Sequence, residues 1–299
     1  MKRPHKLLVL GARGRLGAAL TREYERDWDV VACGRQEADL GDPESAASAV
    51  RRACPDVVIN CAAMTNVDVC ESERELAEIV NSVAPGAIAR ACSGIGARMV
   101  HISTDYVFSG TARAPYAEDA SAEPLSWYGE TKLAGERAVL EAGERHAVAR
   151  VAWVFGPDRD SFIDKALQLS LRGEPVRAVD DKFGSPTFTL DAAGALRSLF
   201  DPSVPGGVYH LCNSGVCSWR DWAQQAIDAA ADIGVAVTTR HVEPLKLVDI
   251  PAMIAPRPVY TAMSCTRIET LLGAPLRGWR EAVGDYVRLL RDSGRLSAA

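Results

Sequence analysis

The first half of the chain alternates short apolar runs with longer stretches of helical periodicity. Uninterrupted apolar runs of this length are typical of strands buried on both faces, as in a parallel sheet. The runs predict strands at 7–10, 30–33, 57–60, 99–102 and 147–154. The stretches between them predict helices at 16–25, 43–53, 73–93 and 128–142. This alternation indicates a doubly wound parallel α/β sheet, the Rossmann fold.

Local signals mark two of these helices. Asp42 and Pro43 are typical of the N-cap and the first position of the helix at 43–53. Pro85 predicts an interruption within the stretch 73–93, because proline lacks a backbone N–H to donate.

The alternation of predicted strands and helices becomes less regular after about residue 155. This half predicts helices at 162–171, 190–200, 219–233 and 278–290, and strands at 175–179 and 208–211. Four prolines predict a loop over 244–260. We therefore expect a dinucleotide-binding domain at 1–155 and a smaller α/β substrate lobe at 156–299, some of whose segments return to the first domain.

The composition is globular and narrows the range of partners. Apolar residues make up 47% and charged residues 24% of the 299, and the formal net charge is −5. That charge argues against nucleic-acid binding through a general basic field. The apolar runs are too short for a signal peptide or a membrane span. We expect a cytoplasmic protein without a membrane or nucleic-acid partner, and the sequence leaves a homodimer open.

The eight cysteines form no Cys-x-x-Cys pair, and most lie within apolar runs. They are expected to be buried thiols of a cytosolic protein rather than zinc ligands. No other cluster of metal-ligand spacing stands out, so the sequence predicts no metal site.

A glycine-rich loop joins the first predicted strand to the first predicted helix. Gly11, Gly14 and Gly17 have the spacing Gly-x-x-Gly-x-x-Gly, and Arg13 and Arg15 add positive charge. Glycines there allow a tight turn and close approach of a diphosphate to the N-terminus of the helix. The loop therefore predicts a dinucleotide cofactor.

The end of the second predicted strand indicates which cofactor is preferred. An NAD enzyme usually carries an acidic residue there, which binds the ribose 2′-hydroxyl. Here Gly34 is followed by Arg35, which can hold a 2′-phosphate. The sequence thus favours NADPH, with NADH as the alternative.

Tyr128 and Lys132 form a Tyr-x-x-x-Lys pair on one face of a predicted helix. Reduction of a ketone by hydride needs a proton donor, and a tyrosine can act as one if its pKa is lowered from about 10. We expect Lys132 to lower that pKa. Ser103 and Thr104 end the fourth predicted strand, where a Rossmann sheet binds ligands. Thr104 can then hydrogen-bond the developing oxyanion.

Longer motifs identify a family. Among them are His101-Ile-Ser-Thr-Asp-Tyr-Val-Phe108 and Pro124-Leu-Ser-Trp-Tyr-Gly-Glu-Thr-Lys-Leu-Ala-Gly-Glu136. Further matches lie at 56–63, 152–155, 183–187 and 207–211. With these motifs the chain resembles the dTDP-4-dehydrorhamnose reductase family, in the extended short-chain dehydrogenase/reductase superfamily. The resemblance covers nearly the whole chain and implies reduction of a dTDP-4-keto-6-deoxyhexose.

The resemblance also implies roles for individual residues. The residues implied at the cofactor's diphosphate are Gly14, Arg15 and Leu16. Those implied beside the adenine are Asp39 and Leu40, and those along its inner half are Ala62, Ala63, Met64 and Thr65. The implied catalytic set is Thr104, Tyr128 and Lys132. The implied substrate contacts are Thr104, Asp105, Tyr128, Trp153 and Arg257. Trp153 is equally typical of core packing.

Other functions stay open at this point. A relative could reduce another nucleotide deoxysugar, because the segment 259–264 in the second lobe matches the family less closely. The chain also resembles the non-catalytic regulatory β subunit of methionine adenosyltransferase. A dehydratase would carry an acid after Thr104 and Asp105, where Tyr106 stands here. An epimerase would show no net NADPH consumption, and magnesium dependence is open.

Overall fold

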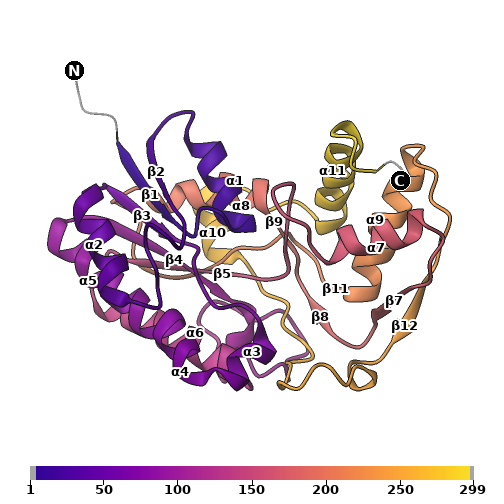
Figure 1. Cartoon of the computed structure of the whole chain (residues 1–299), viewed down its shortest axis with the longest axis horizontal. Helices are drawn as coiled ribbons and strands as arrows, with labels where there is room; N and C mark the ends of the chain where they lie inside the picture. Colours follow the sequence, from indigo (N-terminus) through magenta and orange to yellow (C-terminus); the bar gives the residue numbers. More distant parts are fainter. Residues whose placement is uncertain (1–4, 297–299) are drawn as a thin grey trace.

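The computed structural model describes residues 5–296 and contains a six-stranded parallel sheet. Its strand order is β10-β5-β4-β3-β1-β2. The strands are β1 (Lys6–Leu10), β2 (Asp29–Cys33), β3 (Val57–Asn60), β4 (Arg98–Thr104), β5 (Ala147–Val151) and β10 (Gly207–His210). The Rossmann-like sheet predicted from the apolar runs is therefore confirmed, and β10 joins it from the second half of the chain (Figure 1).

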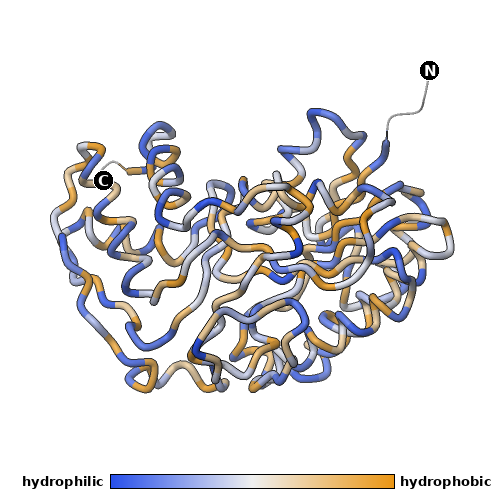
Figure 2. The backbone as a smooth tube through the Cα atoms, turned by 180° about the vertical axis from the view of Figure 1, so that it is seen from behind, coloured by the Kyte–Doolittle hydropathy of each residue, from blue (hydrophilic) through white to orange (hydrophobic). Residues whose placement is uncertain are grey.

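Helices cover both faces of the sheet, which explains why its strands are continuously apolar. Leu7 and Val9 of β1 pack in a core with helices α1 (Arg15–Tyr24), α8 (Thr189–Leu196) and α10 (Thr266–Leu272). Leu8 and Leu10 point to the opposite core, with helices α2 (Pro43–Ala53) and α5 (Ala84–Ile95). Hydrophobic and hydrophilic residues alternate along the helices around the sheet (Figure 2), as surface helices require.

Elements of the second half of the chain form a smaller lobe with its own aromatic core. Its helices are α7 (Phe162–Leu171), α9 (Trp219–Asp232) and α11 (Trp279–Asp292). Its strand pairs are β7 (Val176–Val179) with β12 (Val242–Leu245), β8 (Phe183–Gly184) with β11 (Cys217–Ser218), and β6 (Val154–Phe155) with β9 (Thr187–Phe188). Phe155, Trp222, Trp279 and Tyr286 pack together in this core.

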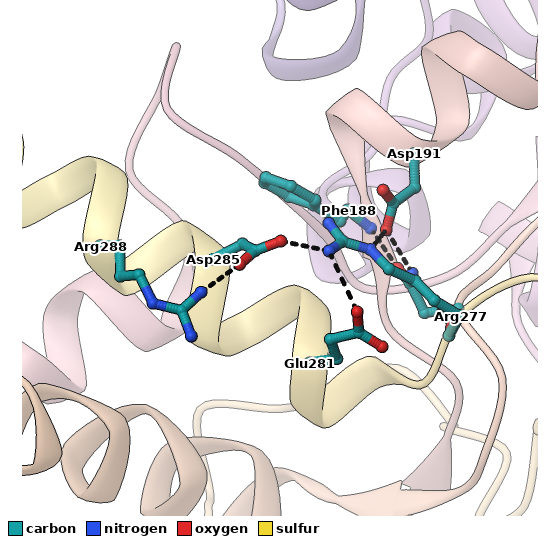
Figure 3. Close-up of polar contacts among 7 residues, drawn as sticks. Phe188, Asp191, Arg277, Glu281, Asp285 and Arg288 are labelled. Carbon is teal, nitrogen blue, oxygen red and sulfur yellow. Dashed lines mark hydrogen bonds and ion pairs between the residues drawn. The ribbon is translucent and has the colours of Figure 1, made fainter.

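A cluster of charged residues ties this lobe to the sheet domain (Figure 3). Arg277, just before α11, donates to Asp191 of α8 at 2.8 Å and also binds Asp285 of α11. The guanidinium lies over the Phe188 ring, 5.6 Å from its centroid. The cluster is therefore a structural clamp between α8 and α11.

Two boundaries differ from the sequence prediction for physical reasons. The fifth strand ends at Val151, because Trp153 has a φ of 45° and turns the chain away to form β6. Pro244 lies inside β12, which pairs only with β7, so the missing N–H faces no partner strand. The predicted loop at 244–260 is therefore partly wrong.

The predicted helix at 73–93 also has a different interior. It consists of α4 (Arg74–Glu78), a π-helical turn (Ile79–Val83) and α5, with Pro85 in the first turn of α5. The predicted interruption near Pro85 is therefore confirmed, and it lies in the turn directly before this proline, whose missing N–H and ring act on that side. The short helix α3 (Val67–Ser72) was not predicted. Within residues 5–296, no helix combines the length and apolarity needed to cross a membrane.

Candidate active site

A cavity of about 860 Å³ opens at the carboxyl ends of the central strands. Its walls include these residues proposed from the sequence: Gly14, Arg15, Leu16, Ala63, Thr65, Ser103, Thr104, Asp105, Tyr128, Lys132 and Trp153. Ligands of doubly wound sheets bind at this edge. The structure therefore brings one part of the predicted cofactor set together with the predicted catalytic set.

The glycine loop has no room for side chains at two positions. A Cβ on Gly11 would lie 2.7 Å from the backbone nitrogen of Ala62, and the φ of Gly11 is +75°. A Cβ on Gly17 would lie 2.2 Å from the carbonyl oxygen of Gly11. Gly14 is the N-cap of α1, so the N–H groups of the first turn face the cavity edge. This loop fits a dinucleotide diphosphate.

The side chains predicted to be catalytic are held by the start of helix α6 (Trp127–Glu141) and by the end of β4. Ser126 caps α6 by accepting from the backbone N–H of Gly129 at 3.3 Å. A Cβ on Gly129 would lie 2.3 Å from the carbonyl oxygen of Tyr106. The missing side chain therefore lets α6 lie against the segment after β4, and Thr104 and Tyr128 line the same cavity.

Burial raises the pKa of Tyr128 above its usual value, and the hydrogen bond with Thr104 partly opposes that shift. Lys132 is oriented toward β4, where its Nζ donates to the carbonyl oxygen of Ile102 at 2.7 Å and lies 3.1 Å from Nε2 of His101. The expectation that Lys132 lowers the pKa of Tyr128 is therefore wrong for this structure. Thr104 opposes the rise in the pKa of Tyr128, but only in part.

Lys132 itself is 1% exposed. Burial lowers its pKa to about 8, and the nearby carboxylate of Glu136 acts in the opposite direction. Arg150 of β5 donates to both carboxylate oxygens of Glu136, at 2.9 and 2.6 Å. Ser103 donates to the same carboxylate at 2.5 Å. Glu136, Arg150 and Ser103 thus form a buried polar network next to Lys132.

The predicted substrate side contains Asp105 and Trp153. Asp105 accepts from Thr104 at 3.1 Å and from Thr261 at 2.5 Å. Burial raises its pKa, and the neighbouring ammonium of Lys182 opposes that shift. Trp153 lines the cavity and stacks on Trp222, with the ring centroids 5.7 Å apart.

Sequence reasoning missed Lys182 and Thr261. Both lie in the second half of the chain, and both are fully buried beside the segment that follows β4. Burial lowers the pKa of Lys182 to about 8. Its Nζ donates to the carbonyl oxygen of Pro258 and lies 4.9 Å from the centroid of the Tyr106 ring. Lys182 directly precedes the family match at 183–187, which was a signal for it, whereas Thr261 lies in the segment 259–264 that matches the family less closely.

Arg257 does not line the cavity. Its guanidinium donates to both oxygens of Asp68 in α3, at 3.0 and 2.5 Å, and its side chain is 8% exposed. The Asp68 carboxylate also accepts from the backbone N–H of Ala255 at 2.9 Å. This ion pair fastens the loop before residue 260 to the sheet domain.

The predicted adenosine end consists of exposed ion pairs outside the cavity walls. Arg35 contacts Asp39 at 3.3 Å, and Arg13 contacts Glu37 at 3.0 Å. Glu37, which sequence reasoning missed, also accepts from the backbone N–H of Gly34 at 2.8 Å. Glu37 thus lies at the end of β2, beside the position where Arg35 was expected to hold a 2′-phosphate.

Three other predicted residues sit behind or beside the cavity. Leu40 is buried in the core with α2 and α5. The backbone N–H of Ala62 donates to Asn60. The backbone of Met64 is held by Asn81, which accepts from its N–H at 2.9 Å and donates to its carbonyl oxygen at 3.0 Å. Asn81 lies in the π-helical turn, a distortion frequent at functional sites.

A loop of the second lobe adds a cation to the cavity mouth. Arg159 and Asp160 line it beside the glycine loop. Arg15 donates to the carbonyl oxygen of Arg159 at 3.0 Å and to that of Asp160. The lobe therefore reaches across to the predicted diphosphate site. Over the described part of the chain, no cluster of three histidine, cysteine or acidic side chains has the arrangement of a metal site.

Comparison with known proteins agrees with this geometry. The model of the RmlD substrate binding domain family matches residues 5–291. The dTDP-4-dehydrorhamnose reductase of Mycolicibacterium smegmatis is 40% identical over 94% of this chain and 85% of its own length. The spore coat polysaccharide biosynthesis protein SpsK of Bacillus subtilis is 36% identical over 95% and 97%. The structure of dTDP-4-dehydrorhamnose reductase from Bacillus anthracis in complex with NADP is 28% identical, covers 96% of this chain and 100% of that one, and has a TM-score of 0.88.

Proposed function

Because the chain belongs to the RmlD substrate-binding family, we propose that it reduces the C4 keto group of dTDP-4-dehydrorhamnose with NADPH and forms dTDP-L-rhamnose. It is a nicotinamide-dependent oxidoreductase acting on a nucleotide sugar. One observation carries the proposal: Gly14, Thr104, Tyr128 and Lys132 line the same cavity.

Different residues of the cavity have different roles in the reaction. When bound, the reduced nicotinamide supplies the hydride. The glycine loop and the N-terminus of α1 hold the diphosphate, where backbone N–H groups meet negative charge. Tyr128 donates its phenolic proton to the C4 oxygen. Because burial raises its pKa, Tyr128 stays protonated at neutral pH, the form that a proton donor needs. The Thr104 hydroxyl binds the same oxygen and disperses its developing charge.

The proposed substrate contacts lie on the other side of the cavity. Asp105 can accept from sugar hydroxyls, and the Trp153 ring offers an apolar surface beside them. Arg257 donates to both carboxylate oxygens of Asp68, so the substrate's diphosphate would compete with Asp68 for its guanidinium. Binding of the substrate is thus coupled to the contact between the loop and α3.

A preference for NADPH is part of the proposal. Arg13 and Arg35 lie at the end of β2, and each is bound to an exposed carboxylate that a 2′-phosphate can displace. The Glu37 carboxylate would instead repel a 2′-phosphate and accept a hydrogen bond from the 2′-hydroxyl of NADH. NADH therefore stays the competing cofactor.

Absorbance of NADPH tests the assignment, with purified protein, dTDP-4-dehydrorhamnose and NADH in parallel. Rapid oxidation with dTDP-L-rhamnose as product is the expected result. Oxidation that gives another epimer, or oxidation only with another keto sugar, would assign the protein to the reduction of another nucleotide deoxysugar. Bound NADPH without turnover on a panel of keto sugars would favour the regulatory-subunit alternative.

A further inference from the structure

Asn60, the last residue of β3, is fully buried behind the cavity. The backbone N–H of Ala62 donates to its Oδ1 at 3.0 Å. Because a backbone N–H can only donate, this bond fixes the orientation of the amide. The Nδ2 group of Asn60 therefore faces Nδ1 of His101, at 3.2 Å.

His101 lies opposite Asn60 in the register of β3 and β4 and is also fully buried. Burial and the charge of Lys132 keep its pKa well below the usual value, so the ring is neutral and carries one N–H. The amide Nδ2 of Asn60 can only donate, so Nδ1 of His101 accepts. The single proton therefore sits on Nε2, which lies 3.1 Å from Nζ of Lys132.

This tautomer distinguishes the two forms of the lysine. An ammonium has three donors and no acceptor, so it would oppose the Nε2–H of His101. An amine has a lone pair that accepts from it. We propose that His101, fixed in the Nε2–H tautomer by Asn60, is a positioning residue that stabilises the amine form of Lys132 and so sets the proton affinity of the lysine. The kinetic consequence rests on the proposed function, whereas the tautomer does not.

Other groups around Lys132 act on the same equilibrium. Glu136, one turn further along α6, favours the ammonium, although its carboxylate is shared with Arg150 of β5. The Cys61 thiol faces it from the end of β3, and Tyr128 lies one turn earlier on α6. Burial favours the amine. His101 is the neighbour whose effect depends on a tautomer.

A lysine of weakened proton affinity suits the reduction. Tyr128 gives its proton to the C4 oxygen, and the ammonium of Lys132, which lines the same cavity one turn along α6, is the proton source that restores the phenol. The amine that remains accepts from the Nε2–H of His101, and water then returns the proton to Lys132. Reduction therefore declines as the pH rises through the pKa of Lys132, and any change that raises this pKa extends activity to higher pH.

The tautomer can be read without substrate or cofactor. Long-range proton–nitrogen correlation spectra of protein labelled with ¹⁵N-histidine show which ring nitrogen carries the proton. The spectrum of His101→Phe identifies the His101 signals among the five histidines. We expect protonated Nε2 in the wild-type protein and protonated Nδ1 in Asn60→Asp, because a carboxylate accepts both from the N–H of Ala62 and from the ring. Protonated Nδ1 in the wild-type protein would overturn the proposal, whether or not any variant folds.

The kinetic test is a double-mutant cycle in which the pH dependence of NADPH oxidation is measured. Asn60→Asp should move the basic limb of the kcat/KM profile upward by about one pH unit, a tenfold change in proton affinity. The added charge alone would act in the same direction, so the substitution is repeated in a His101→Phe background. Loss of the shift there supports an action through the imidazole. A shift of the same size in both backgrounds would overturn it.

The two proposals fail in different ways. Absence of turnover with every keto sugar would overturn the reductase function while the wild-type spectrum still decides the tautomer. Turnover of the expected substrate together with protonated Nδ1 in the wild-type protein would leave the reductase function intact and exclude the role of His101.

Discussion

The two ends of the proposed cofactor site use charge in opposite ways. At the catalytic end, Lys132 is 1% exposed and is surrounded by hydrogen-bond partners with fixed roles. At the adenosine end, the Arg35 side chain is 80% exposed and contacts only one carboxylate that is itself partly exposed. The first end is a buried network, and the second is a set of surface ion pairs.

This difference in burial determines how easily the charged residues at each end can exchange partners. A charge in the interior must be paired and hydrogen-bonded, because an uncompensated one costs several kcal/mol. Exposed ion pairs contribute about 0–1 kcal/mol, so their members can exchange partners with a ligand at little cost. The catalytic groups at the buried end therefore tolerate little change, whereas substitutions at the exposed end can alter the preference between NADPH and NADH.

The largest expected effect is the loss of the proton donor. Tyr128→Phe removes the phenolic hydroxyl and keeps the ring, so turnover of the keto sugar should fall about 10² to 10⁴-fold. NADPH affinity, measured by fluorescence titration, should change little and serves as the control for folding. Turnover close to the wild-type rate would show that another group supplies the proton.

The second effect concerns stability at the buried end. Glu136→Ala leaves Arg150 buried without its carboxylate, so the free energy of unfolding should fall by about 3–5 kcal/mol in urea denaturation. Glu37→Ala breaks an exposed pair at the other end and should cost about 1 kcal/mol or less. Equal losses in the two variants would contradict the contrast between the ends.

Local signals in the sequence predict much of the fold. Helix α2 has the predicted bounds, and Asp42 caps it by accepting from the backbone N–H of Glu44. Each strand of the sheet follows from its own apolar run, and the glycine loop from its spacing. These features depend on residues close together in the chain.

The remainder of the site depends on contacts between distant segments. The pair between Asp68 and Arg257 joins residues 189 positions apart, and the second-lobe loop around Arg257 carries no helix or strand periodicity. The contact between Asn60 and His101 requires the register of two neighbouring strands. A hydrophobic pattern fixes which face a residue takes, but it does not state which polar side chains meet.

The smallest expected effect tests the exposed end. Arg35→Ala should weaken NADPH binding about fivefold relative to NADH, the size of a surface ion pair. The preference for NADPH in the wild-type protein should also decline as salt rises from 10 mM to about 150 mM, because exposed charges are screened. Arg177→Ala, which removes another exposed arginine paired with Glu243 in the second lobe, is the matched control. If Arg35→Ala left the cofactor ratio unchanged at low salt, the preference would have to be set by Arg13 of the glycine loop and its partner Glu37.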